Sequence, residues 1–121
     1  METKYGSSLQ DWERAKEEMR GVLVETARRK EFITYSDLVA RVHTVKLDPH
    51  SYALAAMLGE ISTEEHNRGR GMLSALVLSK DEGKPGTGFF ALAEELKLDI
   101  SEPDRFWIAE VNRVHADWAG A

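Results

Sequence analysis

The spacing of apolar residues predicts a long helix at the start of the chain. The segment 9–30 carries an apolar stripe at steps of three and four, and Ser7 or Ser8 can cap its first turn. The basic residues that end the segment lie where a helix dipole favours positive charge. The stripe consists of Leu9, Trp12, Ala15, Met19, Val22 and Thr26.

Two further helices are predicted before the middle of the chain. Thr34 or Ser36 can cap a short helix that runs to about Val42, with Asp37 completing an approximate capping box. A connector follows over 43–50, because Pro49 disfavours helical backbone at the preceding residue.

The third helix is expected over 51–61. It contains Gly59, which is costly inside a helix and therefore predicts close packing of a neighbour at that position. Ser62 and Glu65 then have the spacing of a second capping box, which predicts a separate single helical turn.

The second half of the chain contains the strongest strand candidate. The run 72–79 is short, almost entirely apolar and flanked by turn residues. Residues 81–88 are rich in turn formers, so they predict the tip of a β-hairpin or wing. Phe89 and Phe90 fit either a return strand or a helix that continues to Lys97.

A final helix is predicted from about residue 102. Ser101 is its expected cap, and Pro103 fits the first helical position. An apolar stripe follows at steps of four, three and four, formed by Trp107, Val111, Val114 and Trp118.

This order of elements predicts a mostly helical α+β domain of the winged-helix type. Three helices bury their apolar stripes against one another, a short β-hairpin wing closes the open side, and a C-terminal helix is added. The expected organisation is one domain over 1–121, with an N-terminal tail (1–8), a winged-helix-like core (9–100) and the C-terminal helix (101–121).

Composition narrows the function classes. The 121 residues are 42% hydrophobic and 31% charged, as in an ordinary globular domain, and no apolar run reaches membrane-spanning length. The absence of cysteine excludes thiol nucleophiles and disulfides and predicts a cytoplasmic protein. The net charge of −5 argues against a generally basic nucleic-acid surface, although it allows a local basic patch.

One segment resembles a known family. Residues 33–40, Ile-Thr-Tyr-Ser-Asp-Leu-Val-Ala, are similar to the segment that opens the DNA-binding domain of alkylguanine-DNA alkyltransferases and alkyltransferase-like proteins. The apolar run and the following 79–83 stand where that family has its active-site strand and turn. The family's Pro-Cys-His-Arg motif is absent, which excludes alkyl transfer by the family's mechanism, so the resemblance implies the winged-helix fold and no catalytic residue.

Basic residues on both sides of the predicted strand are the main candidate site. Arg and Lys at a wing can contact phosphates while the third helix faces a groove. Ordinary surface charge is the alternative, because Asp81 and Glu82 offset part of the patch. The predicted nucleic-acid contacts are Tyr35, Ser36, His50, Ser51, Tyr52, Arg68, Arg70, Lys80 and Lys84.

Three other patterns carry less specific chemistry. Residues 84–88 could approach an anion through glycine backbone but lack the Walker spacing. Glu82 and Lys84 imitate half of a nuclease motif, yet lie in a predicted turn. The acidic group at Glu60, Glu64, Glu65 and His66 lacks a metal-ligand spacing. We therefore predict no catalytic residue, no cofactor and no metal.

The leading prediction is a non-catalytic winged-helix-like module that binds double-stranded DNA or assists a DNA-processing protein. The alternative is a protein-interaction or homodimerisation module, which the negative net charge favours. Its docking surface would lie on the last helix, around Phe106, Trp107 and Trp118. A small hydrolytic enzyme ranks third, since no convergent carboxylate–histidine pocket is predicted.

Overall fold

The computed structural model describes residues 2–120, and its longest element is helix α1 (Leu9–Arg28). The predicted apolar stripe is buried along it except for Leu9, which is exposed. The N–H of Asp11 donates to the Ser8 hydroxyl at 3.1 Å, which confirms the predicted cap. The helix stops at Arg28 rather than Lys30, which has a left-handed φ of 55°.

The predicted N-terminal tail is a small hairpin. Strands β1 (Thr3–Lys4) and β2 (Ser7–Ser8) pair in antiparallel orientation, and the turn between them places Tyr5 and Gly6 at φ values of 51° and 86°. The ring of Tyr5 stacks on that of Trp12, with 5.5 Å between ring centroids. The hairpin therefore covers the first turn of α1.

Helices α2 (Tyr35–Ala40) and α3 (Tyr52–Asn67) occupy the predicted second and third helical positions. The Thr34 cap is confirmed by a 3.1 Å hydrogen bond from the N–H of Asp37. The predicted second capping box is wrong, because α3 continues to Asn67 with Ser62 and Glu65 buried inside it. Each of these two side chains binds a partner distant from it in sequence, which a local pattern does not reveal.

The apolar run 72–79 does not form one strand. It begins as a 3-10 turn η1 (Leu73–Leu76) and ends as the two-residue strand β4 (Val77–Leu78). Because Leu73, Leu76 and Val77 are fully buried, the run meets its apolar requirement without extended backbone. Strand β4 pairs in parallel with β3 (Ile33–Thr34), Ile33 opposite Val77 and Thr34 opposite Leu78.

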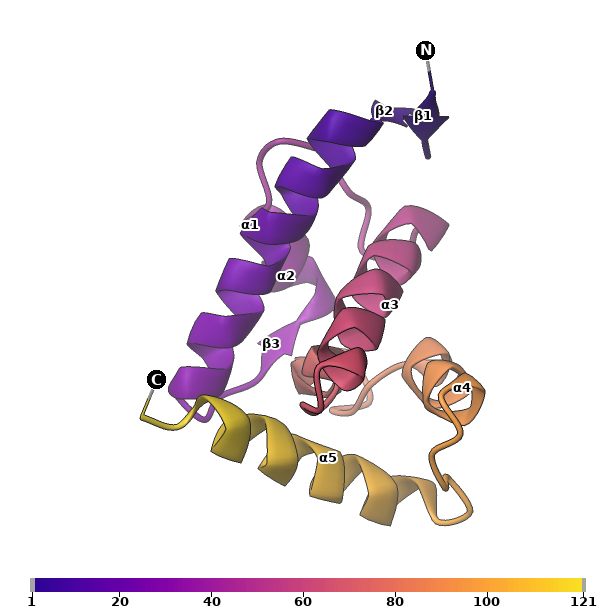
Figure 1. The fold of residues 1–121 in the computed structure, drawn as a ribbon. Coiled ribbons are helices and arrows are strands. Elements are labelled where there is room, and N and C mark those ends of the chain that lie inside the picture. The colour runs from indigo at the N-terminus through magenta and orange to yellow at the C-terminus, as the bar shows by residue number, and fades with distance from the viewer. Residues whose placement is uncertain (1, 121) are drawn as a thin grey trace.

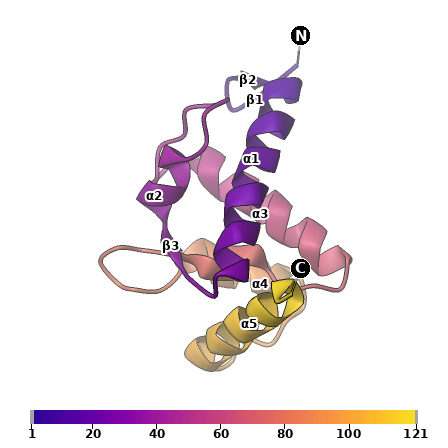
Figure 2. The ribbon, with the colours of Figure 1, turned by 90° about the vertical axis from the view of Figure 1, so that its left-hand side faces the viewer.

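The predicted hairpin wing is also absent from residues 2–120. A loop follows β4 and protrudes beside β3 (Figure 2), and the chain then enters helix α4 (Thr87–Glu95). Phe89 and Phe90 therefore lie in a helix, which was the second of the two alternatives for this segment. The ring of Phe89 is buried and lies 5.8 Å from that of Phe106, a contact that supports helical packing here.

Helix α5 (Pro103–Trp118) crosses the lower ends of α1 and α3, while α4 lies beside α3 (Figure 1). Pro103 opens the helix as predicted, but Glu102 is the N-cap residue rather than Ser101, and no side chain caps this end. The described residues thus form a mostly helical α+β fold, as the sequence predicts, with two small two-stranded sheets in place of the predicted hairpin wing.

Helix α5 holds the irregular segment 69–75 against the core. At Gly71 the two backbones come so close that an added Cβ would lie 2.9 Å from Cγ2 of Val114. Four α5 side chains bind backbone groups of the segment at 2.7–2.9 Å: Arg113 donates to the carbonyl of Gly69, Asp117 accepts from Gly71, Glu110 accepts from Met72, and Trp107 donates to the carbonyl of Ala75.

Candidate functional site

A cavity of about 500 Å³ opens between α3 and α4. Its floor and walls are mainly apolar, from Leu54 and Leu58 on α3 and from Phe89 and Leu92 on α4. The segments just before α3 and α4 line its other sides, together with Tyr35 at the start of α2. Three helix starts that are distant in sequence therefore meet around one opening.

Small residues on the facing sides of the two helices leave this space. Ala55 and Gly59 line the cavity from α3, and Gly88 and Ala91 line it from α4. An added Cβ at Gly59 would come no closer than 4.0 Å to another side chain, the nearest atom being Cδ2 of Leu92. The predicted close packing at Gly59 is therefore wrong, since the glycine faces open volume instead.

The hydroxyl of Tyr35 fixes one end of the cavity. It accepts a 2.9 Å hydrogen bond from the N–H of Gly86, the residue that precedes α4. Burial raises the pKa of the Tyr35 phenol, although the bond from Gly86 opposes that effect, so the group stays protonated at neutral pH. The bond links the start of α2 to the start of α4 at the edge of the cavity.

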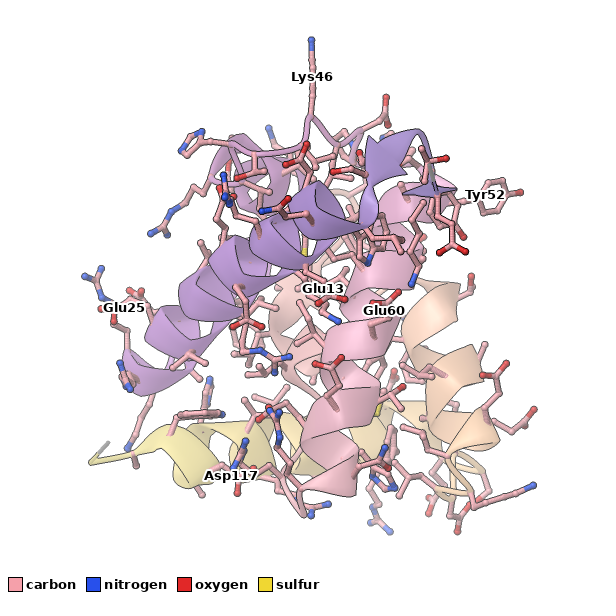
Figure 3. All side chains as sticks on the ribbon, turned by 45° about the horizontal axis from the view of Figure 1, so that its top comes forward. Glu13, Glu25, Lys46, Tyr52, Glu60 and Asp117 are labelled. Atoms are coloured by element: carbon pink, nitrogen blue, oxygen red, sulfur yellow. The ribbon has the colours of Figure 1, made fainter. Side chains whose placement is uncertain are left out.

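Five predicted contact residues lie at or near this cavity. Tyr35, His50 and Ser51 line it, and Ser36 is the exposed residue next to Tyr35. The Ser51 hydroxyl caps α3 by accepting from the N–H of Leu54 at 3.2 Å. Tyr52 follows on α3, but its side chain is 86% exposed and points away from the molecule (Figure 3).

The two predicted lysines lie in the loop between β4 and α4. Lys80 is exposed, and Lys84 approaches Asp104 at 3.8 Å. The loop turns tightly, because the N–H of Gly83 donates to the carbonyl of Ser79 at 2.8 Å and the N–H of Ser79 donates to that of Lys84 at 2.9 Å. Lys84 stands two residues before Gly86, so the loop leads directly to the cavity.

Arg68 and Arg70 lie elsewhere, at the far end of α3, where both bind the carboxylate of Glu65. Arg70 donates to it at 2.6 and 3.1 Å and also places its guanidinium 5.1 Å from the ring centroid of Trp118. Their charge is thus used inside the fold, which argues against the predicted phosphate contacts at these two positions.

Glu65 belongs to a network between α1 and α3. Arg20 on α1 donates to Glu65 at 2.8 Å and also to Glu64, and Lys16 binds Glu64 at 2.8 Å and Glu60 at 3.1 Å. Figure 3 shows Glu13 and Glu60 between the two helices. We call the following residues the α1–α3 charge cluster: Lys16, Arg20, Glu60, Glu64, Glu65 and Arg70.

The cluster keeps its carboxylates ionised. Burial by itself raises the pKa of Glu65, but the hydrogen bond from Arg70 and the charges of Arg70 and Arg20 lower it overall. The same opposition holds for Glu64, whose pKa is lowered by Lys16 and Arg20 against the effect of burial. Lys16 loses some stabilisation of its charge by burial, yet its bonds to carboxylates raise its pKa overall.

These ion pairs also show what the carboxylates of the acidic group on α3 contact. Its carboxylates face cations rather than one another, and His66 joins no such cluster. Among residues 2–120, no three histidine, aspartate or glutamate side chains are placed to hold a metal ion. Glu82 and Lys84 sit in the tight turn described above, so no strand aligns them as a nuclease motif requires.

Sequence reasoning missed the α4 side of the cavity. Ala91, Leu92 and Glu95 line it, but their spacing alone indicates an ordinary amphipathic helix. Ser74 was also missed; it is a buried residue that lines the cavity, and its hydroxyl lies 2.7 Å from that of Ser62. The small residues around Gly86 and Gly88 were the one sequence signal that could have indicated the cavity, because small side chains leave space beside the start of a helix.

Comparisons of the chain with models of protein families, with curated proteins and with solved structures find no match. No helix formed by residues 2–120 is long and apolar enough to cross a lipid bilayer. The geometry of the site is therefore the basis of the proposed function.

Proposed function

We propose that the chain is a non-catalytic, mostly helical module that binds double-stranded DNA through the surface around the mouth of the α3–α4 cavity. The observation that carries the proposal is the meeting of the starts of α2 and α3 with the segment after Lys84. Tyr35, His50 and Ser51 line one opening although they come from separate segments. In helix-turn-helix modules, the start of the second helix of the pair approaches the bases.

One exposed lysine near the cavity supports this surface. Lys80 lies in the loop that leads from β4 to the cavity, and within residues 2–120 it forms no salt bridge. Arg41 and Lys46 in the α2–α3 connector form none either, and Lys46 points away from the molecule (Figure 3). Unpaired cations also lie elsewhere among these residues: Arg14, Arg28, Lys30, Lys97 and Arg113. The basic residues of the charge cluster are all paired instead. A free cation in the loop beside the cavity favours phosphate contact there.

The structure changes which residues we assign to the contact. Tyr35, Ser36, His50, Ser51, Tyr52, Lys80 and Lys84 stay in the proposed interface. Arg68 and Arg70 leave it, since both are bound to Glu65. Because the hairpin wing is absent, the loop over 79–86 takes its place in the proposal. Asp81 and Glu82 lie in that loop, so binding requires Lys80 and Lys84 to face the phosphates while the acidic pair faces solvent.

Fluorescence anisotropy with a mixed-sequence DNA duplex tests the proposal. The chain should bind more tightly at about 50 mM than at about 200 mM salt. The double variant Lys80→Ala/Lys84→Ala should bind every sequence more weakly, and its plot of log affinity against log salt should be shallower by about two units. Arg14→Ala/Arg28→Ala is the matched control, because both arginines are exposed on α1, which does not line the cavity.

Two results would overturn the DNA proposal. The first is no binding at the lower salt concentration, where electrostatic attraction is strongest. The second is an equal loss of affinity in both double variants, since the contact would then be spread over the whole surface instead of the loop.

A protein-interaction module is the second candidate, and exposed apolar side chains on and beside α5 favour it. Phe32 and Ile108 are 44% and 55% exposed, and the ring of Phe32 lies 6.2 Å from that of Trp107. The previously expected surface is mostly used in packing, because Phe106 contacts Phe89 and Trp118 lies under Arg70. A second copy of the chain is the proposed partner, tested by light-scattering mass across a dilution series with Ile108→Asp as the disrupting variant.

A further inference from the structure

The α3–α4 cavity has the size and lining of a small-molecule site. Ligand cavities commonly enclose about 300–1,000 Å³ and combine apolar walls with a few polar groups. This cavity measures about 500 Å³. Gly59 and Ala55 face it from α3, although larger side chains at these positions would fill it. The space is thus built into the sequence of the helix rather than left by poor packing.

The interior of the cavity holds no charge that a charged ligand could pair with. Of the lining residues, only His50 and Glu95 have basic or acidic side chains, and both are exposed. Moving an ionised ligand group into an apolar interior without a partner costs several kcal/mol. The walls therefore favour an uncharged ligand.

The hydroxyl of Tyr35 offers a specific polar contact. Its oxygen already accepts from the N–H of Gly86, so its hydrogen is available to a further acceptor. Within residues 2–120 this hydroxyl donates to no protein group. A ligand with a carbonyl or similar acceptor can take this hydrogen bond while its apolar part contacts Leu58 and Leu92.

From these observations, we propose that the α3–α4 cavity binds an uncharged, mainly apolar small molecule that carries one hydrogen-bond acceptor. A small molecule fits better than an extended chain segment, because Tyr35 and Gly86, joined by their hydrogen bond, line one side of the cavity and limit its length. This proposal does not rest on the proposed DNA binding, although Tyr35, His50 and Ser51 belong to both sites, and a separate measurement tests it.

Three probes of similar size distinguish the ligand classes. Acetophenone is uncharged with one acceptor, ethylbenzene lacks the acceptor, and benzoate is charged. Titration of the ¹⁵N-labelled chain with acetophenone should shift the amide signals of Gly59, Gly88 and Leu92. Ethylbenzene should bind at the same signals about three- to tenfold more weakly, the factor expected for one hydrogen bond. Benzoate should bind least.

Two variants tie the binding to this cavity. Tyr35→Phe should weaken acetophenone about three- to tenfold and leave ethylbenzene nearly unchanged, which also shows that the cavity persists. Ala55→Leu fills the opening from an exposed helix position and should abolish both signals. Ala109→Leu is its matched control, since Ala109 is exposed on α5 outside the cavity.

Absence of any shift with acetophenone would overturn the proposal. Binding of benzoate as tight as that of acetophenone would overturn the uncharged class, and equal binding of acetophenone to Ala55→Leu would place the site elsewhere. Each result leaves the DNA measurement unaffected.

Discussion

Glu65→Gln is expected to destabilise the chain by about 3 kcal/mol, the lower end of the range for breaking a buried ion pair. The Glu65 side chain is fully buried, and it receives hydrogen bonds from Arg20 at 2.8 Å and from Arg70 at 2.6 Å. Glutamine keeps the shape and one acceptor oxygen but leaves these cations without the charge they face. We use the lower end of that energy range because the Arg70 side chain is 34% exposed and can recover part of its hydration.

The loss is large enough to measure by thermal unfolding. With about 2.1 cal/mol/K of unfolding entropy per residue, a chain of 121 residues changes its Tm by about 4 °C per kcal/mol. Glu65→Gln should therefore lower the Tm by about 12 °C, followed by circular dichroism at pH 7.

Glu13→Gln is the matched control for this substitution. Glu13 also binds Lys16, at 3.0 Å, but its side chain is 60% exposed. Exposed ion pairs contribute less than about 1 kcal/mol, so the Tm should change by at most a few degrees. The reasoning about burial is refuted if the two variants lose similar amounts of stability.

Three further predictions concern the fold. Gly71→Ala should destabilise the chain by about 1–3 kcal/mol in urea unfolding, because its Cβ would press on Val114. The control Gly21→Ala, on the exposed side of α1, should stabilise the chain by about 0.5–1 kcal/mol. Equal effects of the two substitutions would contradict the close approach at Gly71. Thr34→Ala should cost about 1 kcal/mol through the lost cap of α2, and an unchanged midpoint would show that the cap contributes nothing. The carboxylates of the α1–α3 charge cluster have lowered pKa values in the folded chain, so the stability they add is complete above the ordinary value of 4.5 and is lost as the pH falls through their folded values. Urea unfolding at pH 7 and pH 3 should show a smaller difference in Glu65→Gln than in the native chain, and the same difference in both would argue against this linkage.

Local signals in the sequence predicted the helices well. The caps at Ser8 and Thr34 form as expected, because each depends only on a side chain and an N–H three residues later. The apolar stripe of α1 from Trp12 onward is buried for a similar reason, since the helical repeat alone brings its residues to one face.

Features that depend on distant partners were not predicted. Ser62 and Glu65 have the spacing of a cap, but their positions are decided by Ser74 on η1 and by Arg20 on α1. The run 72–79 is apolar enough for a strand, yet burial by α1, α3 and α5 satisfies a 3-10 turn equally well. The cavity was missed because it arises between α3 and α4, whose separation no single segment encodes.

The contacts between α5 and the segment 69–75 can form only late in synthesis of the chain. Backbone groups of this segment are bound by Glu110, Arg113 and Asp117, which leave the ribosome after all the other helices. Until α5 emerges, the apolar residues around Met72 and Leu73 have no complete cover. Nascent chains are therefore expected to stay open to chaperones until α5 is released, and then to close in one step.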